Sequence, residues 1–153
     1  GAEDGHLQDP FHYLGGLFKL KISAEDTDGA MCIFDTIRMQ KGGPGLHVHY
    51  QQDEWFYVIE GDFIFQIGDD RFELGPGDSA LGPRNIPHAF AKVSEGQGKL
   101  LIVFSPAGRI EHLFTEAAAM IGHGGMPENF VRDFKQLVKK YDIDVVGPPL
   151  ALP

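Results

Sequence analysis

Glycine and proline interrupt the chain at short intervals between residues 17 and 105, and this spacing constrains the fold more than any other feature. Nine short runs that contain apolar residues lie between these breaks: 17–23, 31–40, 46–49, 55–59, 63–67, 71–74, 79–82, 88–93 and 99–105. Short strands separated by turn residues are typical of antiparallel sandwiches and barrels. The sequence therefore predicts an all-β domain of about nine short strands.

The period of the apolar residues changes after Pro106. One helix is predicted over 109–121 and a second from Pro127 or Glu128 to about Tyr141, each with a single apolar face. The tail at 145–150 is apolar and extended, and it docks either on the body or on a partner. We expect one domain: an arm with little regular structure (1–16), a barrel (17–105), and helices with a tail packed on the barrel (106–153).

Charge and cysteine content exclude several classes of protein. The formal net charge is −9 with only 13 Lys and Arg, so nucleic acid and anionic membranes are not expected partners. The single cysteine, Cys32, precludes an intrachain disulfide and lies in an apolar run, so we expect a core residue and a cytoplasmic protein. No apolar run is long enough for a transmembrane helix. The chain starts without methionine, which leaves open a removed N-terminal segment.

Four side chains predict a metal site. His47 and His49 are two residues apart, so they share one face of a strand, and Glu54 at the start of the next strand can return to that face. His88 is a fourth candidate, and Asp53 is the main rival to Glu54. Three imidazoles and a carboxylate suit one divalent ion of Mn, Fe, Co, Ni, Cu or Zn. The donor set alone fits both an open octahedral site and a closed zinc site.

Other residues are secondary candidates. Phe56 and Val58 share the parity of Glu54, and Phe90 that of His88, so they either line a pocket or fill the barrel. Arg38 and Arg84 either orient an anionic substrate oxygen or form surface salt bridges. The remaining histidines are expected at the surface, with His123 in a glycine-rich hinge: His6, His12, His112 and His123.

These motifs resemble the cupin family. Its first motif matches at His47-Val48-His49, Glu54 and Gly61, with Gly42 and Gly43 beside the leading glycine position. Its second motif matches at Gly77, Pro83 and His88, with Asn85 in place of a glycine and Lys92 in place of the final Asn. Since Asn tolerates a left-handed backbone, the turn at Asn85 can survive. The resemblance implies a jelly-roll barrel, a double-stranded β-helix, with a short helical extension.

A narrower resemblance is to quercetin 2,3-dioxygenase-like cupins, carried by residues 53–61, 104–108 and the Val-Gly-Pro-Pro segment of the tail. It implies dioxygenase activity at a mononuclear site on a small aromatic or enolisable substrate. Glu54 would then be both ligand and catalytic proton acceptor. A metal-dependent isomerase or lyase, and a binding domain without turnover, are the alternatives. The resemblance also implies a homodimer.

Overall fold

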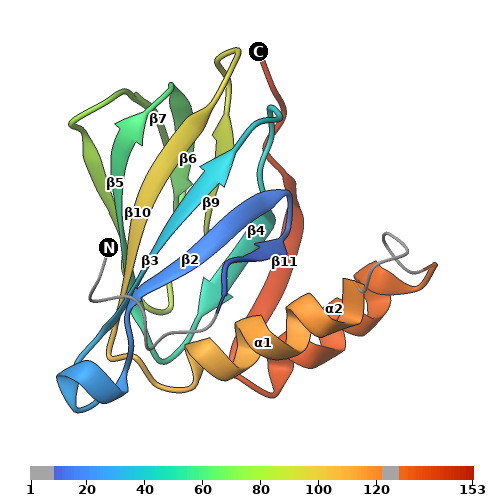
Figure 1. Ribbon diagram of the computed structural model, residues 1–153. Coiled ribbons are helices and arrows are strands. Elements are labelled where there is room, and N and C mark those ends of the chain that lie inside the picture. The colour runs from blue at the N-terminus through green and yellow to red at the C-terminus, as the bar shows by residue number, and fades with distance from the viewer. Residues whose placement is uncertain (1–8, 122–127) are drawn as a thin grey trace.

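Two antiparallel sheets face each other, and two helices lie across one end of them, in the computed structural model, which describes residues 9–121 and 128–153 (Figure 1). The strands are β1 (Phe11–Tyr13), β2 (Gly16–Ile22), β3 (Cys32–Arg38), β4 (Gly45–His49), β5 (Asp53–Glu60), β6 (Phe63–Ile67), β7 (Asp70–Leu74), β8 (Ser79–Gly82), β9 (His88–Lys92), β10 (Gly98–Ser105) and β11 (Ile143–Pro149). The helices are η2 (Glu25–Thr27, 3-10), α1 (Ile110–Ile121) and α2 (Phe130–Lys139). All nine predicted strands are present, with ends within two residues of the expected positions.

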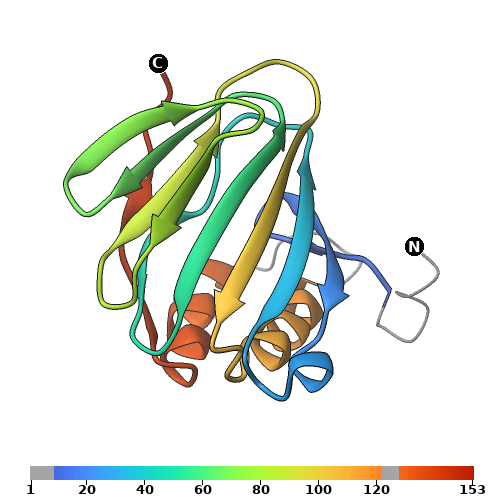
Figure 2. The ribbon, with the colours of Figure 1, turned by 90° about the vertical axis from the view of Figure 1, so that its left-hand side faces the viewer.

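The two sheets form the jelly roll that the sequence predicts. One sheet has the strand order β1-β2-β3-β10-β5-β8 and the other β11-β4-β9-β6-β7, with antiparallel pairing throughout. Figure 2 shows the sheets facing each other, with the helices across one end. Strands that are distant in the chain pair directly, as β5 does with both β10 and β8. The predicted all-β fold class is therefore confirmed.

Alternation along the strands selects the residues that face inward. In β3, Cys32, Phe34, Thr36 and Arg38 are buried while the residues between them are partly exposed. Cys32 is a free, fully buried thiol, as predicted. Phenylalanines dominate the core, and rings from the sheets, β1 and α1 contact one another around Phe34 and Phe114.

The helices use the apolar faces that the sequence predicts. In α1 the buried residues are Ile110, Leu113, Phe114 and Ala117, and in α2 they are Phe130, Leu137 and Val138. Helix α2 begins at Phe130, later than expected, after a turn at 128–129; Pro127 lies outside the described residues. Within the described residues, no helix is long and apolar enough to cross a membrane.

Two segments near the ends of the chain form strands beyond the nine predicted. Residues 11–13, expected to lack regular structure, form β1 and pair with β2 through a turn at Leu14-Gly15, both with positive φ. The extended tail is β11, which pairs with β4 along the outer edge of the smaller sheet. The tail therefore docks on the body. Proline is tolerated at such an edge position, where its missing N–H costs no ladder bond.

Candidate metal centre

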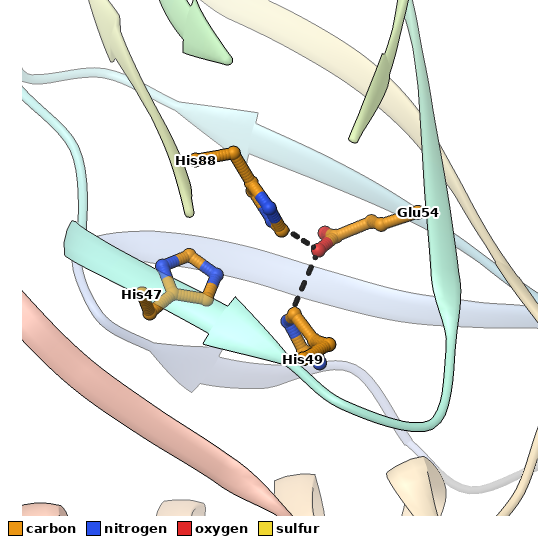
Figure 3. Close-up of side chains that lie close together, drawn as sticks. All are labelled: His47, His49, Glu54 and His88. Atoms are coloured by element: carbon orange, nitrogen blue, oxygen red, sulfur yellow. Dashed lines mark hydrogen bonds and ion pairs between the residues drawn. The ribbon is translucent and has the colours of Figure 1, made fainter. Parts of the chain in front are cut away.

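The four predicted ligands come together from three strands. His47 and His49 lie on β4, Glu54 on β5 and His88 on β9, and their side chains converge (Figure 3). One nitrogen or oxygen from each lies within 4.8 Å of all the others. The imidazole centroids are 4.5–5.4 Å apart. The structure thus brings together the residues that sequence spacing selects, and their role as metal ligands remains a prediction.

Strand register explains this convergence. His47 is paired with His88 across β4 and β9. Glu54 is paired with Gly82 of β8, where a Cβ would lie only 3.0 Å from Nδ1 of His88. A glycine at position 82 therefore leaves the space that the His88 ring occupies, a role that sequence reasoning did not assign.

Glu54, and not its rival Asp53, is the carboxylate of the cluster. Its Oε1 contacts Nε2 of His88 at 2.8 Å and Nε2 of His49 at 3.2 Å, and the residue is 4% exposed (Figure 3). Asp53 points to the surface and accepts hydrogen bonds from the backbone N–H and the guanidinium of Arg84. Of the two readings of Arg84, the surface salt bridge is correct.

Burial and the neighbouring rings set the protonation of the cluster. Burial would raise the pKa of Glu54, but hydrogen bonds from His49 and His88 outweigh it and hold that pKa well below its usual range. Burial, helped by the two other imidazoles, lowers the pKa of His47 to about 3. At neutral pH the carboxylate is ionised and His47 is neutral, the forms in which these residues bind metals.

His47 is oriented for coordination by its backbone. Its Nδ1 lies 2.8 Å from the carbonyl oxygen of Gly45, and because a carbonyl only accepts, Nδ1 carries the proton. The lone pair is then on Nε2. A histidine ligand that donates its other N–H to a carbonyl is the usual arrangement in metal sites. The donor set and the tautomer therefore both fit a transition-metal ion.

The cluster opens into a large cavity. Three of its members, His47, His49 and Glu54, line a space of about 580 Å³. The rest of the lining comes mainly from apolar side chains of β1, β2, β10, α1, α2 and β11, including Tyr13, Phe18, Phe104, Phe114, Phe130, Phe134 and Val145. Phe90 is also part of this wall, whereas Phe56 and Val58 are buried in the core away from it. The helices and β1 therefore form much of the cavity wall beside the cluster.

The secondary candidates divide between surface and interior. Arg38 is buried and lines the cavity, so the surface salt bridge expected as one alternative is wrong for it. His12 and His112 are exposed, as predicted, while His6 and His123 lie outside the described residues. Asn85 has φ 71°, the left-handed conformation expected of a glycine substitute. Lys92 is fully buried and donates to backbone carbonyls of Ser94 and Gly96, which fixes the loop before β10.

Comparison with known proteins agrees with this architecture. Residues 36–104 match the family described as the Cupin domain. Among curated proteins, an uncharacterized protein of Methanocaldococcus jannaschii, MJ1618, is 30% identical over 61 residues, which is 40% of this chain and 49% of that protein. The match thus spans about half of that relative.

Solved structures share the fold at low sequence identity. KdgF from a Halomonas species is 20% identical with a TM-score of 0.57, covering 66% of this chain and 88% of its own. An RmlC-like cupin from Shewanella frigidimarina is 22% identical with a TM-score of 0.56, covering 67% and 87%. Streptomyces PAC13, solved with uridine and described as a nucleoside dehydratase, is 15% identical with a TM-score of 0.53, covering 65% and 75%.

At these identities the structural likeness establishes the fold alone. The family match runs from β3 to β10, and this range contains the strands that carry all four candidate ligands. The jelly-roll barrel and the match of residues 36–104 to the Cupin domain together show that the chain has the fold of a single-domain cupin.

Proposed function

We propose that the protein is a metal-dependent dioxygenase for a small, largely apolar molecule that carries an oxygen donor. One observation carries this proposal: the His47/His49/Glu54/His88 cluster forms part of the wall of the apolar cavity of about 580 Å³. A structural metal ion needs no cavity beside it, whereas a cavity of this volume is typical of small-molecule sites. The pairing of the two features therefore favours an open site.

A divalent transition metal held by these residues would act as a Lewis acid toward a substrate oxygen and, if redox-active, would supply electrons for reaction with dioxygen. Glu54 would then serve as the proton acceptor for the substrate hydroxyl, since its carboxylate lines the cavity and is directed at the cluster. Both imidazole contacts go to Oε1, so Oε2 is the oxygen that we assign to proton transfer.

The apolar wall supports an apolar or aromatic substrate. Phe90, Phe104 and Phe114 line the cavity, and such rings both stack on aromatic molecules and exclude water from the site. A nucleoside, such as the uridine solved with PAC13, presents several hydroxyls that need polar partners. The apolar lining offers few such partners, so a dehydratase of that type is the weaker candidate.

The first experiment measures metal content in protein purified without chelator or a nickel column. We expect near one equivalent of metal in the wild type and loss of most of it in His49→Ala and Glu54→Gln. Asp53→Asn is the matched control, because it removes a neighbouring carboxylate that is hydrogen-bonded to Arg84 and lies outside the cluster. Full occupancy in both His49→Ala and Glu54→Gln would refute the metal assignment.

The second measurement is oxygen uptake by the metal-loaded protein with a catechol or a flavonol. Consumption of dioxygen that is lost in Glu54→Gln reconstituted with the same metal supports the dioxygenase. A fully loaded protein that binds these molecules without consuming dioxygen would contradict it and favour the isomerase, lyase or binding alternatives.

We also propose a homodimer and a cytoplasmic location. The outer face of the larger sheet exposes Ile59 and Leu81 beside the partly buried rings of Trp55 and Tyr57, which is an apolar surface suited to a second copy. Light scattering would show twice the chain mass. The free thiol of Cys32 suits a reducing compartment.

A further inference from the structure

Arg38 is a buried cation in the wall of the cavity. It ends β3, on the same inward face as Phe34 and Thr36, and it is only 4% exposed. Its side chain lines the same space as His47, His49 and Glu54. Most of the cavity wall is apolar, and a buried guanidinium in such a wall requires a physical explanation.

The protein only partly satisfies this guanidinium. One Nη donates to the carbonyl of Leu14 at 2.7 Å, and the guanidinium lies over the ring of Phe90 at 5.4 Å. Its Nε is buried without a hydrogen-bond partner. Among residues 9–121 and 128–153, no carboxylate forms an ion pair with it. Because buried charges are normally paired, this guanidinium can offer its charge and its buried Nε–H to an anion in the cavity.

The β1–β2 turn is shaped to hold the guanidinium in place. Leu14 adopts φ 47°, which is unfavourable for a residue with a Cβ, and its carbonyl receives the hydrogen bond from Arg38. A Cβ at Gly15 would lie 2.9 Å from one Nη, and a Cβ at Gly16 would lie 3.1 Å from the other. Burial lowers the pKa of Arg38 to about 10, so the group stays charged at neutral pH.

We propose that Arg38 binds a carboxylate of the substrate. The substrate would then be an apolar acid that carries a metal-binding oxygen at the end opposite its carboxylate. Phe90 relates Arg38 to the cluster. It lies under the guanidinium of Arg38, and it is two residues beyond His88 on β9, about 7 Å along the strand. A small molecule can therefore reach both. Only the metal end of this assignment rests on the proposed function; anion binding by Arg38 does not.

A single carboxylate fits the charge of the site. One guanidinium balances one negative charge, whereas a phosphate dianion calls for further cations. Among the described residues that line the cavity, the other cationic side chain is Lys135, which is exposed on α2 at the rim. Lys135 is therefore the competing anchor that an experiment must separate from Arg38.

The test compares two probes of one shape, 2-naphthoate and the neutral 2-naphthamide, by titration calorimetry. We expect the wild type to bind the carboxylate about tenfold to a hundredfold more tightly than the amide, the effect of one charged hydrogen-bonding partner. Arg38→Gln should abolish this preference while still binding the amide, which shows that the cavity is intact. Arg38→Lys, which restores the cation, should recover part of it.

Controls assign the preference to one residue. Arg84→Gln removes the paired arginine at the surface and should leave the preference unchanged, as should Lys135→Gln at the rim. His49→Ala tests whether the carboxylate binds the metal instead, and it should also keep the preference. No preference in the wild type, or a preference that persists in Arg38→Gln, overturns the proposal.

The same protein samples keep this test apart from the proposed function. Metal content is measured on each variant, and Arg38→Gln should retain full occupancy because Arg38 donates to Leu14 and lies over Phe90, while no hydrogen bond or ion pair between described residues joins it to the cluster. A wild type with full metal and oxygen uptake but without carboxylate preference sinks only the role of Arg38. A wild type with the preference but without metal sinks only the dioxygenase.

Discussion

The ligand cluster and the cavity wall are built by different means, although they share one space. The cluster comes from three barrel strands, and its geometry follows from strand register, as in the pairing of His47 with His88. The wall comes largely from the two ends of the chain: β1, α1, α2 and β11. The chemistry is therefore set by local alternation, whereas the shape and polarity of the substrate space depend on long-range packing.

This division assigns separate tasks to the two regions. A cupin barrel can keep its cluster while the terminal elements change what reaches it. In this chain the terminal elements supply aromatic rings on α1 and α2 and, through the β1–β2 turn, the support of Arg38. The two regions can therefore be compared in their stability, in their response to acid and in the local conformations that hold the cluster.

The largest expected effect is on stability. Phe114 of α1 contacts rings of Tyr13, Phe34 and Phe104, whereas Phe56 contacts Phe65 and Phe90 inside the barrel. We expect Phe114→Ala and Phe56→Ala each to lower the free energy of unfolding by about 3–5 kcal/mol, because each leaves a large buried space. Comparable losses would show that the wall folds together with the barrel.

Urea unfolding followed by two probes checks this expectation. Trp55, the one tryptophan, reports on the barrel by fluorescence, and circular dichroism at the helix minimum reports on α1 and α2. In both variants the two transitions should coincide. If Phe114→Ala separates the two transitions, with the helices unfolding first, the barrel and the helices are independent units of stability.

The cluster could be predicted from the sequence because its geometry is local. A period of two places His47 and His49 on one face, and the short turn returns Glu54 to it. The sequence alone does not separate Glu54 from Asp53, since the orientation of Asp53 depends on its partner Arg84, which lies 31 residues away. Long-range pairing of this kind leaves no periodic signal in a single sequence.

The wall could be predicted only in part. The apolar stripes of α1 and α2 were visible, but not the end of the barrel that they cover. Gly15-Gly16 is a turn signal, but nothing in the sequence predicts the positive φ of Leu14, because leucine rarely adopts it, and Pro148 and Pro149 argue against a strand at β11. Arg38 did carry a signal: it shares the parity of Phe34 in β3, and strict alternation places it inside.

The next effect concerns acid. In metal-free protein, the pKa of His47 is about 3 when folded and 6.5 when unfolded, so below pH 6.5 the unfolded chain takes up a proton that the folded chain does not. Stability should fall by at most about 1.4 kcal/mol per pH unit on acidification through this window. Below pH 4.5, Glu54, whose pKa is lowered by folding, adds to the loss.

Chemical denaturation of chelator-treated protein at several pH values measures this slope. His47→Gln should flatten it between pH 6.5 and 4.5, whereas His112→Gln, at an exposed position on α1, should leave it as it is. An unchanged slope in His47→Gln would mean that the acid sensitivity arises outside the cluster.

The smallest effect tests a backbone conformation beside the cluster. Asn85 has φ 71°, and its N–H donates to the carbonyl of His49 at 2.8 Å, so this turn is tied to the ligand strand. Asn85→Gly should change the free energy of unfolding by less than about 0.5 kcal/mol, whereas Asn85→Ala should cost about 1 kcal/mol, because alanine disfavours the left-handed region. Thermal unfolding of the two variants measures the difference. Equal stabilities would mean that the turn relaxes without strain, and the cluster would then be held by strand register alone, without the loop that precedes His88.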